Sequence, residues 1–463
     1  MEYLEAKRLG KWIDNLQGPA CVRFYRRQIG RGACASGASN DTCLQSLPQE
    51  RVPPDPYRLS ACIVKIGNWS ECAVDSGKPP ATSVVAFVPG VGASHTMWLS
   101  LVELLSERCN GNRTSVGRTL VCLIDNRGTG GSELYPPPAP ICRCVRARER
   151  KANLSLWTAQ ALADDARYVL EQVLGATKAL DSTHANTSIR LFLVGHSLGS
   201  AILCHLLLTS PPLEVSGIMF LSMHQGRFRD WFPPSARAVR ASVRYWLWWI
   251  RAATISTTAL QNERKRLRLL TQRAAIDLSL HFSDAFLASP LEPAAQRSLL
   301  HAQRTDPSAG ELHHIRRSAE TATATASALP KKRYSRPIRR HEWYLFNYTA
   351  ESLERFRAWD EIADVRHSSG RNADPLNAYG SLGQLHAVQV YRLTRENLER
   401  LRVRIPEKAM LLYGRDDPLT RPRACRAFAE ALGIPAIELT GAHLITEESK
   451  IPLAQFLLDL VRA

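Results

Sequence analysis

The chain has 463 residues, of which 45% are hydrophobic and 22% charged, and its formal net charge is +17. This composition excludes a wholly disordered chain, and the 26 glycines exclude a collagen-like one. The longest apolar run, residues 245–250, is far shorter than the ~20 residues that span a bilayer. The length suits two or three domain-sized units, or one large domain with an insertion.

Most of the basic surplus lies between residues 225 and 404. Such a surplus suits an acidic membrane surface, a nucleic acid or an anionic substrate, or it is simply a solvated, arginine-rich segment. No zinc finger, helix-turn-helix or RNA-binding motif accompanies it, so we expect no specific nucleic-acid partner.

The 11 cysteines are scattered and form no pair of C-x-x-C knuckles, so we expect no metal site. Residues 1–15 mix acidic and basic side chains and lack the apolar segment of a secretory signal. We therefore expect reduced thiols and an intracellular, cytoplasmic location, with the N-x-S/T sequons as chance matches.

The first part of the chain, residues 1–80, is predicted to be a partly irregular N-terminal extension with a strand pair near residues 62–74. From residue 83 onward, short β-branched runs such as SVVAFV, TLVCLID and SIRLFLVG alternate with helical patterns as far as residue 223. This rhythm predicts βαβ units and a mostly parallel sheet. The strands are apolar at nearly every position, as expected where helices cover both faces of a sheet.

After this rhythm ends, residues 224–403 are predicted to be helices and loops, with helices over ASVRYWLWWIRAATI and TQRAAIDLSLHFSDAFL. Within this segment, residues 301–340 are predicted to form a basic disordered loop. The alternation then resumes with KAMLLYG, RACRAFAEALG and AIELT, and a helix near residues 451–461 closes the chain. We predict an α/β core made of residues 81–223 and 404–463, interrupted by a large helical cap at residues 224–403.

One motif carries the chemistry, the G-x-S-x-G pattern with Gly195, Ser197 and Gly199 between an apolar strand and a helix that starts near Ser200. A serine on a sharp strand-to-helix turn projects its hydroxyl above the sheet edge, and the glycines leave room for that turn. This context predicts a nucleophilic serine. The alternative is a glycine-rich turn with a helix-capping serine.

A nucleophilic serine needs a base and an orienting acid. Asp417 follows the strand KAMLLYG and His443 follows the strand AIELT, in the order Ser, Asp, His that is typical of this motif. We predict His443 as the base and Asp417 as the acid, with Asp416 as the competitor of Asp417. Alternatively, Asp417 is a turn residue and His443 a capping histidine.

The oxyanion hole of such a site is built from backbone N–H groups. We predict that Leu198 supplies one donor and Val91 the other, from the loop after the strand SVVAFV. Gly90 in this loop lets the backbone approach a substrate closely. The alternative is that the loop is only a glycine-rich turn.

Six segments occur in order along the chain: PGVGASHTMW, DNRGTGGS, ALADDARYVL, GHSLGS, LLYGRDDP and GAHLITEE. Together they resemble the α/β-hydrolase superfamily, in particular its esterase/lipase-like branch. The resemblance implies Ser197 as nucleophile, His443 as base and Asp417 as acid, with no metal or organic cofactor. The family usually has His-Gly where this chain has Pro89-Gly90, so the supporting contacts of that histidine are missing here.

We therefore predict a serine hydrolase that cleaves a carboxylic ester, for example a lipid acyl ester, or a thioester through an acyl-enzyme. The alternatives are a non-catalytic interaction protein with this fold, and an acyltransferase that uses the same triad. The expected partner is a small acyl substrate. The segment SVRYWLWWIRAAT suits peripheral membrane contact, and it equally suits a cap helix over the acyl pocket. The sequence carries no signal of an oligomeric state.

Overall fold

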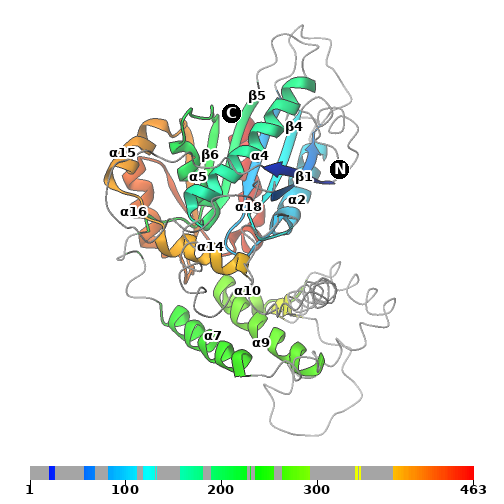
Figure 1. Ribbon diagram of the computed structural model, residues 1–463, viewed down its shortest axis with the longest axis vertical. Helices are drawn as coiled ribbons and strands as arrows, with labels where there is room; N and C mark the ends of the chain where they lie inside the picture. The colour runs from blue at the N-terminus through cyan, green and yellow to red at the C-terminus, as the bar shows by residue number, and fades with distance from the viewer. Residues whose placement is uncertain are drawn as a thin grey trace, which may run out of the picture.

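The computed structural model contains one eight-stranded sheet with helices on both faces (Figure 1). It describes residues 20–26, 57–67, 82–111, 118–130, 132, 157–180, 189–226, 230, 235–254, 263–291, 339–341, 344–345 and 379–462. The strand order is β1-β2-β4-β3-β5-β6-β7-β8. The strands are β1 (Ala20–Arg26), β2 (Tyr57–Ile66), β3 (Thr82–Val88), β4 (Thr119–Asp125), β5 (Ile189–His196), β6 (Gly217–Leu221), β7 (Lys408–Gly414) and β8 (Ala436–Leu439).

The sheet is parallel from β4 through β3 to β8, whereas β1 pairs antiparallel with β2, and β2 antiparallel with β4. The predicted mostly parallel sheet is therefore confirmed. Every residue of β3 and of β4 is buried. These strands are apolar along their whole length because helices cover both sides of them.

The two faces of the sheet are covered by different helices. Val84 and Ala86 of β3 point into the cluster that contains α4 (Ala159–Leu180), α5 (Leu198–Leu208), α15 (Arg395–Arg404) and α16 (Pro422–Leu432). Val85 and Phe87 point to the opposite side, which α2 (Leu99–Gly111) and α18 (Lys450–Arg462) cover. This alternation follows from the two-residue period of a strand.

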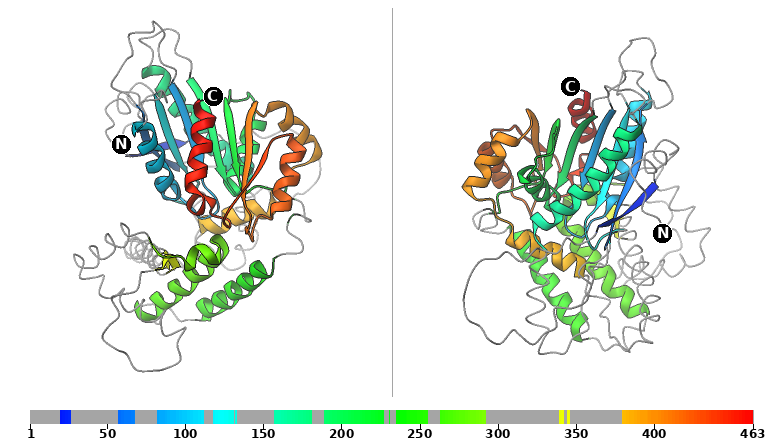
Figure 2. Two further views of the ribbon diagram at one scale, coloured as in Figure 1. Left: turned by 180° about the vertical axis from the view of Figure 1, so that it is seen from behind. Right: turned by 45° about the horizontal axis from the view of Figure 1, so that its top comes forward.

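The β6–β7 connection, residues 222–407, holds α7 (Ala236–Thr254), α9 (Glu263–His281), α10 (Asp284–Ala288), α14 (Tyr379–Val390) and α15. Helices α7 and α9 lie side by side beyond one end of the strands (Figure 2). They pack through a small apolar cluster made of Ala241, Trp248, Leu269 and Ile276. None of the helices that the structure describes is long and apolar enough to cross a membrane.

The sequence predicts one helix over TQRAAIDLSLHFSDAFL, but the structure has two helices there. Helix α9 ends at His281, and α10 starts at Asp284. The break occurs because the Ser283 side chain caps α10 by accepting a hydrogen bond from the Phe286 N–H.

Two predicted boundaries are wrong. The core does not begin at residue 81, because β1 and β2 belong to the same sheet as the other strands. Strand β2 pairs with β1 and with β4, and residues 68–74 of the predicted strand pair lie outside the described residues. The core also resumes before residue 404, because Leu401 of α15 is fully buried in the cluster that covers the sheet. The predicted basic loop at 301–340 lies outside the described residues, except for its last two positions.

Candidate active site

Ser197 occupies the turn between β5 and α5, and α5 begins directly after it at Leu198 rather than near Ser200. Its backbone has φ 53° and ψ −114°, outside the regions that residues other than glycine ordinarily adopt. A Cβ at Gly199 would lie 2.0 Å from the Val88 carbonyl oxygen, and one at Gly195 would lie 2.7 Å from the Gly199 backbone. The strand and helix therefore approach so closely that only glycine fits on either side of the partly exposed serine.

His443 and Asp417 meet at the same edge of the sheet, from the loops after β8 and β7. The Nδ1 of His443 lies 2.8 Å from Oδ2 of Asp417, and both side chains are buried. A carboxylate only accepts hydrogen bonds, so Nδ1 carries the proton and Nε2 is left as an acceptor. The neighbouring Asp416 is exposed, so the structure brings Asp417 and not Asp416 to the histidine.

The Asp417 carboxylate is also held by its own loop. Its Oδ1 accepts hydrogen bonds of 2.8 Å from the backbone N–H groups of Leu419 and Thr420. Burial by itself raises the pKa of Asp417, but His443 and these two N–H groups more than offset it, and the pKa is lowered overall. Asp417 is therefore an anion at neutral pH, as an acid that orients a histidine must be.

The loop of His443 is tied to the serine turn by His196, the residue before Ser197. The Nε2 of His196 donates a 2.9 Å hydrogen bond to the His443 carbonyl oxygen, and the two imidazole rings lie 4.7 Å apart. Burial and the nearby His443 lower the pKa of His196 to about 3, so it stays neutral. In the described part of the chain the Ser197 hydroxyl forms no hydrogen bond to His443. Such contacts often tighten only when substrate is bound.

The loop after β3 lies over the serine turn. A Cβ at Gly90 would be 3.5 Å from that of Ser197 and 3.0 Å from Nδ1 of His196. Within the described residues, the N–H groups of Val91 and Leu198 donate to no other protein group. Both N–H groups that the sequence predicts as oxyanion donors are therefore without a protein acceptor among the described residues.

Sequence reasoning missed the group that supports this loop, Gln384 of α14, whose side chain is fully buried. Its Oε1 accepts a 2.8 Å hydrogen bond from the Gly92 N–H, and its Nε2 donates one of 2.8 Å to the Arg127 carbonyl oxygen. From the core, Asn126 Nδ2 donates to the Pro89 carbonyl oxygen at 2.9 Å. These two amides thus hold both ends of the segment from Pro89 to Gly92. Asn126 belongs to the segment DNRGTGGS, although that pattern gives it no role of its own, and Gln384 has no sequence signal, because a single amide in a helix is too common to single out.

A second missed residue is Glu448, which joins the His443 loop to the β6–β7 connection. Its Oε1 accepts hydrogen bonds from the N–H groups of Ala442 (2.8 Å) and Ser283 (2.9 Å), and its Oε2 accepts one from the Ser283 hydroxyl. Nearby, the Leu444 N–H donates to the His281 carbonyl oxygen at 2.9 Å. The end of α9 and the start of α10 are thus fixed directly against the loop of His443.

The same contact region has an apolar side. Leu278 and Phe282 from the end of α9 pack with Leu444 and with Met97 from the loop after β3. The imidazole of His281 lies 5.8 Å from that of His443. Burial and His443 lower the pKa of His281 to about 4, so it adds no charge beside the base at neutral pH. Apolar side chains of the β6–β7 connection therefore border the histidine.

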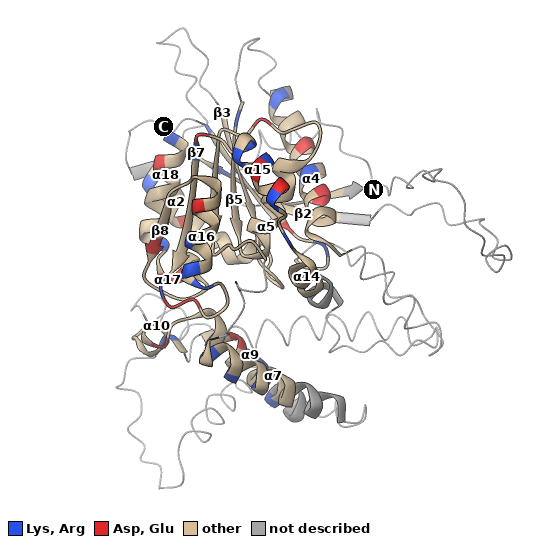
Figure 3. Ribbon diagram, turned by 90° about the vertical axis from the view of Figure 1, so that its left-hand side faces the viewer, with Lys and Arg blue, Asp and Glu red and all other residues tan. Residues whose placement is uncertain are grey.

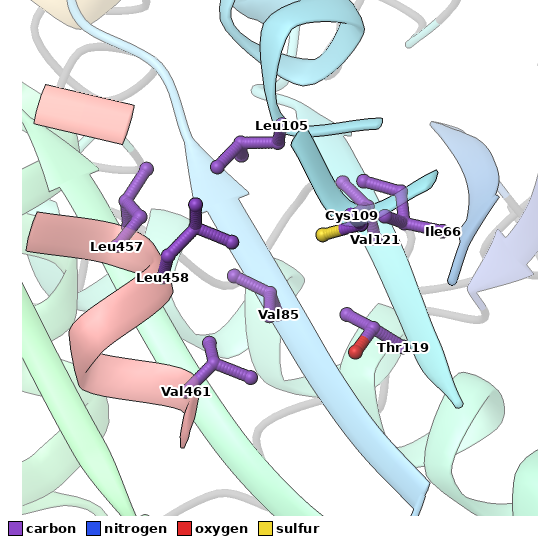
Figure 4. Close-up of a pocket in the computed structure, with 9 residues that line it drawn as sticks. All are labelled: Ile66, Val85, Leu105, Cys109, Thr119, Val121, Leu457, Leu458 and Val461. Carbon is purple, nitrogen blue, oxygen red and sulfur yellow. The ribbon is translucent and has the colours of Figure 1, made fainter. Parts of the chain in front are cut away.

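The structure also contains a cavity of about 30 Å³, roughly the space of one water molecule (Figure 4). It lies between the sheet, α2 and α18, and its lining includes Thr119, the first residue of β4, and Val461. Ser197, by contrast, follows the last residue of its parallel strand. The cavity is therefore remote from the serine and too small for an acyl group. No group of three or more His, Cys, Asp or Glu side chains that could hold a metal ion occurs in the described ranges.

A family model described as alpha/beta hydrolase fold matches residues 83–448. The chain therefore belongs to the alpha/beta hydrolase family. No curated protein sequence matches it.

Solved structures with a similar fold include a hydrolase from Pseudomonas aeruginosa PA01, which is 16% identical with a TM-score of 0.41 over 88% of this chain and 95% of that one. An esterase from Exiguobacterium antarcticum is 12% identical with a TM-score of 0.45, over 88% and 96%. A thermophilic esterase from Thermogutta terrifontis is 14% identical with a TM-score of 0.41, over 88% and 94%.

Proposed function

We propose that the protein is a serine hydrolase that cleaves a carboxylic ester, for example a lipid acyl ester, or a thioester through an acyl-enzyme. In this proposal Ser197 is the nucleophile, His443 the general base and Asp417 the acid that orients the histidine. The observation that carries it is the 2.8 Å contact between His443 and Asp417 beside a serine with positive φ. This arrangement holds the base in the tautomer that can accept the serine proton.

The reaction follows from these positions. Ser197 attacks the acyl carbonyl carbon, and Nε2 of His443 takes the hydroxyl proton and returns it to the leaving group. The N–H groups of Leu198 and Val91 stabilise the oxyanion that forms at the carbonyl oxygen. Water then attacks the acyl-enzyme, again with His443 as the base, and regenerates Ser197. No metal or organic cofactor takes part in these steps.

We propose further that α9 and α10 act as a cap over the acyl side of this site. Support comes from the apolar packing of Leu278 and Phe282 against Leu444, and from the hydrogen bonds between Ser283 and Glu448. A cap that contacts the loop of the base can exclude water from the acyl group and select its shape.

The test is labelling with a fluorophosphonate, which reacts with activated serines. We expect the wild-type protein to be labelled, and Ser197→Ala and His443→Ala to lose labelling, because removing either member of a triad costs on the order of 10⁴–10⁶ in rate. The matched control is Ser242→Ala, which removes an exposed hydroxyl on α7 and should leave labelling unchanged. A folded wild-type protein that stays unlabelled would favour the non-catalytic alternative.

A further inference from the structure

The outward side of α7 is apolar although it faces solvent. Val239, Val243 and Trp246 are 45%, 51% and 61% exposed, and their spacing places them on one side of the helix. The opposite side packs against α9 through Ala241 and Trp248. Helix α7 therefore has two apolar sides, and only one of them is covered in the part of the chain that the structure describes.

Two further exposed side chains flank this row. Tyr245 and Leu247, next to Trp246, are also exposed, at 38% and 45%. Among the described residues, four other large hydrophobic side chains are exposed, and they are dispersed over three helices. They are Leu385, Val390, Val403 and Ile451. Single exposed apolar residues are ordinary, whereas a contiguous row with aromatic members indicates an interaction surface.

A row of arginines runs beside the apolar row. Arg240 and Arg244 each follow a member of the apolar row by one residue, and both are exposed. Neither forms an ion pair with an acidic group among the described residues. In contrast, Arg237 is engaged by Asp284 at 3.1 Å. Helix α7 contains no acidic residue, and Figure 3 shows its basic segments beside those of α9.

We propose that α7 is an interfacial helix by which the protein binds the surface of an anionic lipid bilayer. Tryptophan, tyrosine and aliphatic side chains enter the boundary between headgroups and acyl chains, while adjacent arginines pair with lipid phosphates and carboxylates. A nucleic acid would engage the arginines but would leave the valine and leucine side chains without a partner. This inference goes beyond the proposed function and does not depend on it.

The position of α7 relates this surface to the site. The Ser235 hydroxyl, just before α7, donates to the Pro418 carbonyl oxygen at 3.3 Å, and Pro418 directly follows Asp417. Arg237 donates to the Ser279 and Phe282 carbonyl oxygens near the end of α9. A bilayer bound along α7 would thus lie beyond the same end of the strands as the candidate active site (Figure 2).

The experiment is co-sedimentation of the full chain with vesicles of phosphatidylcholine alone or with phosphatidylserine, at low and high salt. We expect binding to the phosphatidylserine vesicles, which weakens as salt screens the arginines. The double variant Val243→Glu/Trp246→Glu should reduce binding at least about tenfold, because two side chains that enter the interface become charged. Arg240→Glu/Arg244→Glu should reduce it by about tenfold or more and abolish the salt dependence.

The matched control is Val403→Glu, which changes an 86% exposed valine on α15, away from the row, and should bind vesicles as the wild type does. Val239→Glu repeats the test with a single exposed change, and thermal unfolding checks that each variant is folded. Ser197→Ala should bind vesicles fully, which separates this inference from the proposed function. Three results would overturn the membrane-binding inference: no binding by the wild type, equal binding to both vesicle types, or unchanged binding by an α7 variant. The inference would also fail if the protein bound no vesicles but formed a dimer that the α7 variants dissociate.

Discussion

The edge of the sheet and the β6–β7 connection contribute to the same candidate site in different ways. Ser197, Asp417 and His443 all stand on loops that directly follow parallel strands, and those strands fix their positions. The β6–β7 connection reaches this edge through single side chains, chiefly Gln384 and Ser283. The comparison indicates that the three proposed catalytic residues stand on loops of the sheet, whereas the connection contacts those loops and the neighbouring loop after β3.

The two regions also differ in how replaceable their contacts are. The strand ends allow few arrangements, because a shift of one residue would turn a side chain to the other face of the sheet. The connection needs only a donor or acceptor at the right point, and many residue types on many helices can supply one. We therefore expect substitutions in the first region to stop the chemistry, and substitutions in the second to tune it.

The largest effect should come from Asp417→Asn. The amide keeps the shape of the side chain but can donate to His443 Nδ1, which favours the wrong tautomer of the base. We expect kcat/KM for a soluble aryl ester to fall about 10⁴-fold. Asp416→Asn changes the exposed neighbour and should leave kcat/KM within about twofold of the wild type. If Asp416→Asn were the inactive variant, the assignment of the acid would be wrong.

A smaller effect should follow from Gln384→Leu, which removes both amide hydrogen bonds and leaves the loop of Val91 without its support from α14. We expect kcat to fall by about 10–100-fold with little change in KM, less than the full loss of an oxyanion donor. Gln384→Glu keeps an acceptor for the Gly92 N–H, so its kcat should lie between that of Gln384→Leu and that of the wild type.

The control for Gln384 is Gln455→Leu, which changes an exposed amide on α18. If the role of Gln384 were purely structural, Gln384→Leu would lower the melting temperature while the kcat of the folded variant stayed unchanged. That result would mean that the loop of Val91 is supported only from the core, through Asn126.

The two regions were also unequally accessible to prediction from sequence. Strands β3 to β8 were predictable because short β-branched runs alternate with helical patterns, and the sequence could place Ser197, Asp417 and His443 in loops after strands because flanking glycines and motif order are local signals. The strands β1 and β2 were missed as part of the sheet, because they join it by antiparallel pairing with a segment distant in sequence. Gln384 was missed for a related reason, because its hydrogen bond to Gly92 spans 292 residues and no local pattern encodes it. Glu448 lies within the segment GAHLITEE, but its contact with Ser283 spans 165 residues and could not be read from that segment.

The smallest effect should be on the stability of the folded protein rather than on the reaction rate. It concerns a pair of residues within the α/β core. His95, before α2, is bound to Asp125 at the end of β4, with its Nδ1 3.0 Å from both carboxylate oxygens. The hydrogen bond to Asp125 raises the pKa of His95, although partial burial opposes it. A raised histidine pKa means that the pair stabilises the folded state most below the ordinary value of 6.5, and that this stability is lost as pH rises through the folded-state pKa.

We therefore expect His95→Gln to lower the free energy of unfolding by about 1 kcal/mol at pH ~5, and by less at pH ~8.5, because only the charged pair is lost. Denaturant unfolding over this pH range measures the difference. The matched control is His386→Gln, which makes the same replacement on α14, where the described residues show no acidic partner. Since His95 touches none of the three proposed catalytic residues, kcat of folded His95→Gln should match the wild type. A large fall in kcat would mean that polar contacts inside the core also set the reacting geometry, and the division between the two regions would have to be drawn elsewhere.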